Sequence, residues 1–141
     1  MKLALSLIVA STLCLAGSAA AAEFDSEKAA ATAGALADQV KAIRADVDPN
    51  PDAPEALKKD LRYIEVHARH VRLGLHEGNR MRTTKGTVSA LAQLVKHARE
   101  DAASLKLSPE TQKKVADAEA TALALEAMYG VKPDNVGSPK N

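Results

Sequence analysis

The apolar residues of this chain recur in four separate stretches, at alternating steps of three and four positions. Such steps place them on one face of an α-helix, which turns once every 3.6 residues. No segment alternates with period two for long enough to indicate a sheet. The sequence therefore predicts an all-α protein with four apolar helix faces. The four stripes are Ala29, Ala33, Leu36, Val40, Ile43 and Val47; Leu57, Leu61, Ile64, Ala68, Val71 and Leu75; Val88, Leu91, Val95, Ala98, Ala102 and Leu105; and Val115, Ala118, Ala122, Leu125 and Tyr129.

Residues that start and stop helices separate the stripes. The links at 48–51, 78–83 and 106–108 are short, and short links join antiparallel neighbours. We therefore expect an antiparallel up-down-up-down four-helix bundle over residues 23–131, followed by a loose Pro/Gly/Asn-rich tail at 132–141. The expected helix starts are Asp25 or Ser26, a capping box formed by Asp52 and Glu55, Thr83 or Thr84, and Ser108 before Pro109; the expected stops are Gly78 and Gly130.

The first 22 residues have the pattern of a secretory signal peptide. Lys2 precedes the apolar run 3–15, and small residues at 20–22 come before Glu23. A run of about 13 apolar residues is too short to span a bilayer, which needs about 20. We expect cleavage before Glu23 and export to the periplasm, taking a bacterial source, with no membrane span afterwards.

Cys14 is the only cysteine, and it lies inside this apolar run. The residues before it, with Leu13 adjacent and Ser11 three positions earlier, do not suit a lipidation site. Cleavage would therefore leave a chain without cysteine, held together by its core alone.

Charge and aromatic content narrow the classes of partner. Residues 23–57 hold three basic and eight acidic residues, whereas residues 58–106 hold eleven basic and five acidic residues and all four histidines. Either an acidic first helix packs beside a basic hairpin, or the hairpin binds anions. The aromatic residues left after cleavage are Phe24, Tyr63 and Tyr129, too few to offer stacking surfaces for nucleic acids or glycans.

The second helix carries an additional apolar face. Tyr63, Val66, His70 and Leu73 lie opposite its core stripe, again at steps of three and four. A helix that is apolar on two faces is usually buried on both. We expect this face to form a homodimer interface; the alternatives are cover by another helix or the tail, or partial exposure.

A polar sector lies between the two faces of the second helix. Glu65 precedes Arg69 by four positions, which predicts an ion pair. Arginine side chains suit phosphate and carboxylate groups. The predicted anion-binding residues are therefore Arg69, Arg72, His76 and Arg80, and the alternative is a solvated face.

The histidines suggest a second kind of site. A hairpin that turns near Met81 would bring His67 to the height of His97, which precedes Asp101 by four positions. Imidazoles with a carboxylate suit zinc, copper or nickel. The alternative is that His97 and Asp101 form only a surface pair. The candidate metal ligands are His67, His70, His97, Asp101 and Glu77.

No catalytic motif accompanies these features. Without Cys-x-x-Cys-His the chain cannot attach haem covalently, although non-covalent haem stays an alternative. We therefore predict a non-enzymatic exported interaction module without a required cofactor, acting as a homodimer or with a periplasmic protein partner. The rival hypothesis is a protein that binds a transition metal or haem through its histidines.

Overall fold

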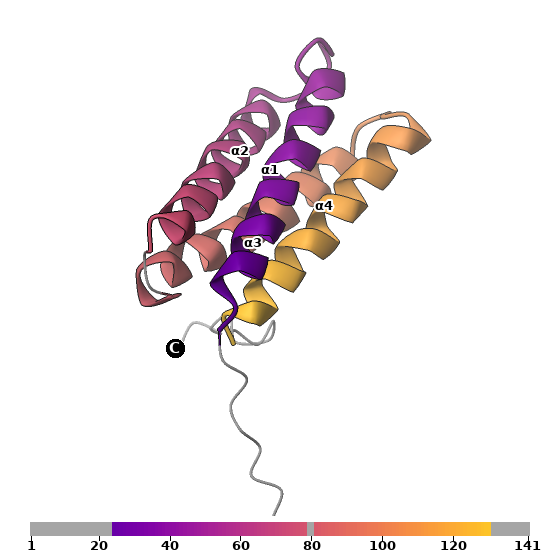
Figure 1. The fold of residues 1–141 in the computed structure, drawn as a ribbon. Helices are drawn as coiled ribbons and strands as arrows, with labels where there is room; N and C mark the ends of the chain where they lie inside the picture. Colours follow the sequence, from indigo (N-terminus) through magenta and orange to yellow (C-terminus); the bar gives the residue numbers. More distant parts are fainter. Residues whose placement is uncertain (1–23, 79–80, 131–141) are drawn as a thin grey trace, which may run out of the picture.

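The computed structural model describes residues 24–78 and 81–130, and these residues contain four helices and no strand. The helices are α1 (Ser26–Val47), α2 (Glu55–His76), α3 (Met81–Ala103) and α4 (Pro109–Met128). Each helix runs antiparallel to the next, and α4 returns alongside α1 (Figure 1). The predicted up-down-up-down four-helix bundle is therefore confirmed. The expected signal peptide at 1–22 and the tail at 132–141 lie outside the described residues. Among the helices described, none has the length and apolar character needed to cross a membrane.

The four predicted stripes form the core. Every stripe residue is buried except Leu105, which is partly buried against the others. One end of the bundle is closed by Tyr129, which is 0% exposed and packs edge-to-face on Phe24 with ring centroids 4.8 Å apart. The hydroxyl of Tyr129 shares a 2.7 Å hydrogen bond with Thr84 Oγ1, so its buried polar atom is satisfied.

Several predicted helix ends are confirmed. The Asp25 carboxylate accepts a hydrogen bond from the Lys28 N–H at 2.9 Å, and Ser108 Oγ accepts one from the Thr111 N–H at 3.1 Å. Gly78 and Gly130 follow α2 and α4 with φ of 82° and 66°. That left-handed conformation strongly favours glycine, and it ends each helix with a sharp turn.

Two predicted helix starts are wrong. The N-cap of α2 is Pro54, without a side-chain cap, and Asp52 lies in the loop, where its N–H donates to Asn50 Oδ1. The residue before a proline is pushed away from helical geometry, so α2 cannot begin earlier.

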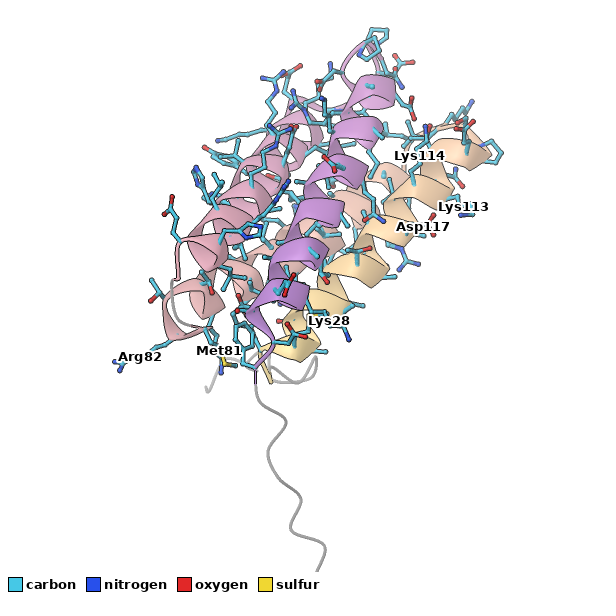
Figure 2. The ribbon with its side chains drawn as sticks, viewed as in Figure 1. Lys28, Met81, Arg82, Lys113, Lys114 and Asp117 are labelled. Carbon is cyan, nitrogen blue, oxygen red and sulfur yellow. The ribbon has the colours of Figure 1, made fainter. Side chains whose placement is uncertain are left out.

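The start of α3 is also earlier than expected, because the helix begins at Met81 and includes Thr83 and Thr84. Figure 2 shows Met81 at the same end of the bundle as Lys28, and Met81 is partly buried against the core there. Thr84 caps nothing; its hydroxyl contacts the Met81 carbonyl oxygen at 3.4 Å and Tyr129 at 2.7 Å.

Candidate functional site

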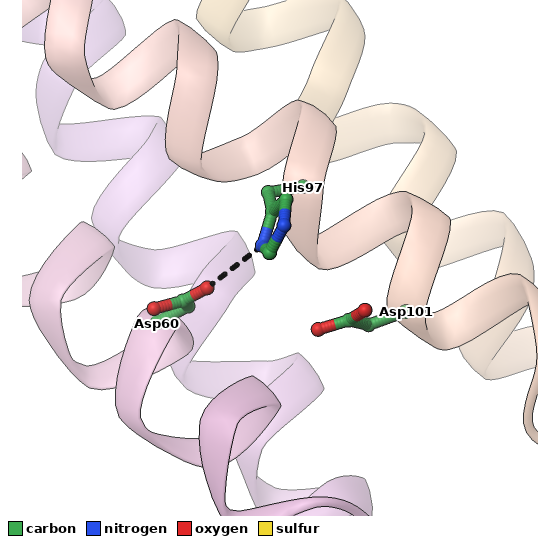
Figure 3. Close-up of side chains that lie close together, drawn as sticks. All are labelled: Asp60, His97 and Asp101. Atoms are coloured by element: carbon green, nitrogen blue, oxygen red, sulfur yellow. Dashed lines mark hydrogen bonds and ion pairs between the residues drawn. The ribbon is translucent and has the colours of Figure 1, made fainter.

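The register between α2 and α3 decides which histidines can meet. His67 lines a hollow of about 290 Å³ together with Gly86, Ala90 and Leu94, so it faces the first half of α3. His97 instead faces Asp60, with 3.3 Å between His97 Nδ1 and Asp60 Oδ2 (Figure 3). The expectation that His67 lies at the height of His97 is therefore wrong. Since α2 ends at His76 and α3 begins at Met81, the hairpin is centred between these residues rather than near Met81, which displaces the pairing by two helical turns, roughly 10 Å.

A cluster of possible metal ligands does occur, with a different membership from the one expected. Among the described residues, one group of three side chains brings its donor atoms within 4.8 Å of one another: Asp60, His97 and Asp101. Two of these, His97 and Asp101, were predicted from the sequence, and Asp60 was not. Asp60 lies seven positions before His67, on nearly the same side of α2, but only the correct register identifies it as the residue opposite His97.

The other three candidate metal ligands do not join this cluster. The rings of His67 and His70 have centroids 6.1 Å apart, but no third ligand is grouped with them in the part of the chain that the structure describes. Glu77 is exposed at the C-terminal end of α2.

The additional apolar face of α2 is open to solvent. Tyr63 is 46% exposed, Val66 47% and Leu73 56%, and His70 is exposed between them. No helix within residues 24–78 and 81–130 covers this face. It is extended by two charged residues in the same row, and the whole row is called the α2 outer face: Lys59, Tyr63, Val66, His70, Leu73 and Glu77.

Glu65 of the second helix already engages two arginines. Arg69 donates to Glu65 Oε1 at 2.7 Å, which confirms the predicted pair. Arg44 of α1 donates to Glu65 Oε2 at 2.5 Å and to Asp48 Oδ2 at 3.0 Å. These carboxylates, Glu65 first, raise the pKa of Arg44. The contact of Arg44 could not be predicted from the sequence, because it joins two helices.

The remaining predicted anion-binding residues lie in surroundings of mixed charge. The Arg72 side chain packs closely against Gly34 of α1. A Cβ atom added to this glycine would lie 3.1 Å from Arg72 Cδ. Arg72 and His76 line a hollow of about 430 Å³ that Glu27 and Asp38 also line, so an anion there would meet two carboxylates. Arg80 lies outside the described residues. The arrangement favours an acidic α1 packed beside a basic hairpin, and anion binding stays a prediction.

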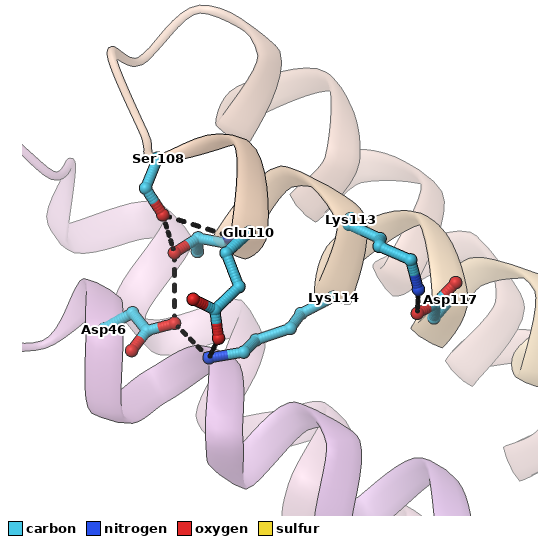
Figure 4. Close-up of polar contacts among 7 residues, drawn as sticks. Asp46, Ser108, Glu110, Lys113, Lys114 and Asp117 are labelled. Carbon is cyan, nitrogen blue, oxygen red and sulfur yellow. Dashed lines mark hydrogen bonds and ion pairs between the residues drawn. The ribbon is translucent and has the colours of Figure 1, made fainter.

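A polar cluster between α1 and α4 is accounted for by its own contacts. Lys114 Nζ lies 2.9 Å from Asp46 Oδ2 and 3.2 Å from Glu110 Oε1, and Thr111 Oγ1 donates to Asp46 at 3.0 Å (Figure 4). The bond from Lys114 lowers the pKa of Asp46 below its ordinary value of 3.8. This cluster fastens the start of α4 to α1 and leaves no obvious ligand position.

Comparisons with protein-family models, with curated proteins and with solved structures find no match to this chain.

Proposed function

We propose that this chain is an exported, non-enzymatic protein-interaction module that acts as a homodimer through the α2 outer face. One observation carries this proposal: three of the four exposed large hydrophobic side chains in the described residues, Tyr63, Val66 and Leu73, lie in one row on α2. Fully burying such a side chain contributes about 1.5–3 kcal/mol, and roughly half of that remains available at each position. Packing this row against the apolar surface of a partner is therefore more favourable in free energy than leaving it in water.

The spacing of the row is that of a helix-pairing seam. The six residues of the α2 outer face follow one another at steps of four, three, four, three and four. This is the heptad spacing by which two helices pack along their length. All six are exposed, so the face is free to pack without unfolding any part of the bundle.

The row is also complementary to itself when it runs antiparallel. A two-fold axis at the level of Ala68 would place Tyr63 opposite Leu73 of a second copy and Val66 opposite its His70. The same axis sets Lys59 against the Glu77 of the second copy, because each is nine positions from Ala68. In such an isologous interface every contact occurs twice, so opposite charges would close both ends of the seam. This charge complementarity indicates that the partner of the α2 outer face is a second copy of the chain.

The rival function, binding of a transition metal or haem by His67, His70 and His97, is less well supported. His67 and His97 lie two helical turns apart along the hairpin, and His70 lies in the α2 outer face. Export is supported by the signal peptide predicted at residues 1–22.

A charge exchange tests both the dimer and its orientation. Lys59→Glu or Glu77→Lys alone places like charges together at both ends of the seam, and we expect each to raise the dimer dissociation constant at least tenfold. The double variant Lys59→Glu/Glu77→Lys restores opposite charges and should recover most of the affinity. Light scattering coupled to size exclusion measures this across roughly 1–500 µM, because a single helix pair belongs to the weak interface class.

Two controls make the result decisive. Lys41→Glu makes the same charge change at an exposed position of α1 and should leave assembly unchanged. Val66→Glu/Leu73→Glu should give a folded monomer by circular dichroism. A wild-type protein that is monomeric throughout the range, or a charge-exchanged variant no better than either single variant, would rule out the proposed interface.

A further inference from the structure

We infer that Asp60, His97 and Asp101 form a binding site for a divalent first-row transition metal ion, for which zinc is the probe. The site lies between α2 and α3 and is separate from the α2 outer face. It needs no second copy of the chain, so it stands or falls independently of the proposed dimer. Figure 3 shows the three side chains directed into the same space, one from α2 and two from α3.

The spacing of the donor atoms suits a small dication. A tetrahedral zinc ion with bonds of 2.0–2.1 Å holds its ligand atoms about 3.4 Å apart. His97 Nδ1 and Asp60 Oδ2 already lie 3.3 Å apart, and a carboxylate oxygen of Asp101 lies within 4.8 Å of a donor atom of each residue. The 3.3 Å separation exceeds the usual range of N–H···O hydrogen bonds, 2.7–3.2 Å. The Asp101 carboxylate would have to move inward to complete three ligands.

The charge around the cluster also favours a cation. Within residues 24–78 and 81–130, no lysine or arginine forms an ion pair with Asp60 or Asp101, whereas Asp46, Glu65 and Glu119 each have such a partner. Two carboxylates without a fixed cation stand beside one imidazole. A dication placed among them would gain from both charges without displacing a lysine or an arginine.

The backbone beneath the site is held by the core. Leu57 and Leu61 are buried on α2 on either side of Asp60, and Ala98 and Ala102 are buried next to His97 and Asp101. His97 and Asp101 are one turn apart, so they project from the same side of α3. Ligands on packed helices hold their positions better than ligands on loops, which lowers the cost of assembling the site.

The donor set selects the class of ion. One imidazole and two carboxylates suit zinc or nickel, whereas calcium and magnesium prefer six or more oxygen ligands. Three protein ligands leave a fourth position for water or for a donor from another molecule. A bound ion would join α2 to α3 at the Asp60–His97 contact, which already links their polar edges.

Titration calorimetry with zinc on the exported protein, prepared without a histidine tag, tests the site. We expect one ion per chain, and at least tenfold weaker binding for each of Asp60→Asn, His97→Ala and Asp101→Asn. His67→Ala removes a partly exposed histidine of α2 that lies outside both the cluster and the α2 outer face, and this matched control should bind zinc as the wild type does. Calcium should bind at least a hundredfold more weakly than zinc.

A second measurement reports on coordination itself. Cobalt bound in place of zinc should give visible absorption bands that disappear in His97→Ala. The site is refuted if wild type and His97→Ala bind zinc equally, or if Asp60→Asn has no effect. Loss of binding in His67→Ala would instead move the ion to the His67–His70 pair and overturn this assignment. All four replaced side chains are at least partly exposed, so circular dichroism should show the variants folded.

Discussion

Glu65 offers the most informative test of how this bundle is held together. It is only 7% exposed, yet its two carboxylate oxygens each accept a hydrogen bond from an arginine. The two bonds differ in burial: the Arg44 side chain is 26% exposed and the Arg69 side chain 50%. Glu65→Gln keeps the volume, removes the charge and leaves one acceptor oxygen.

The two contacts should therefore differ in energy. A hydrogen bond to a charged group contributes about 1.5–3 kcal/mol where water is largely excluded, whereas an exposed helical pair contributes about 0.3–0.5 kcal/mol. We expect Glu65→Gln to lower the free energy of unfolding by about 2 kcal/mol, because Arg44 then lacks its main charged partner. Arg69→Gln should cost about 0.5 kcal/mol.

Urea unfolding followed by circular dichroism measures both changes at pH 7. In a domain of this size 1 kcal/mol corresponds to roughly 4–8 °C in Tm, so Glu65→Gln should lower Tm by about 10 °C. Glu110→Gln is the matched control, since the Glu110 side chain is 79% exposed and also pairs with a lysine; its effect should be close to zero. If Glu65→Gln costs no more than Arg69→Gln, the contact with Arg44 does not stabilise the fold as argued.

Two further predictions concern the buried Tyr129 and the N-terminus of the exported protein. Burial raises the pKa of Tyr129 above its ordinary value of 10.0, so above pH 10 the unfolded chain loses this proton first and stability falls as pH rises. Tyr129→Phe should lower the free energy of unfolding by about 1 kcal/mol at pH 7, because the bond with Thr84 is lost. Between pH 8 and 11, however, the variant should lose less stability than the wild type. Equal decreases in the urea midpoint of the two proteins over this pH range would contradict the assignment. N-terminal sequencing of the exported protein should begin at Glu23, and a chain that keeps Cys14 would disprove the predicted signal peptide.

Much of the fold could be predicted from the sequence because helical periodicity is a local property. The direction of each side chain around its own helix follows from its position alone. Leu36, Ile64, Leu91 and Leu125 could therefore be assigned to the core, and all four are buried. The start of α4 could be predicted for the same reason, because Ser108 caps this helix by accepting a hydrogen bond from a residue only three positions away.

The axial positions of neighbouring helices relative to one another were decided only by the tertiary structure. In an antiparallel hairpin, an error in the position of the turn is doubled in the pairing across it. Placing the turn near Met81 instead of midway between His76 and Met81 therefore paired His67 with His97, where the structure pairs His97 with Asp60.

The contact between Arg44 and Glu65 depends on the height of α1 against α2 in the same way. Periodicity along one helix carries no information about its axial position against another, because that position is set by loop geometry and by how the two apolar faces interlock. The sequence alone determined which residues face inward, and the packing of the bundle determined which surface side chains meet.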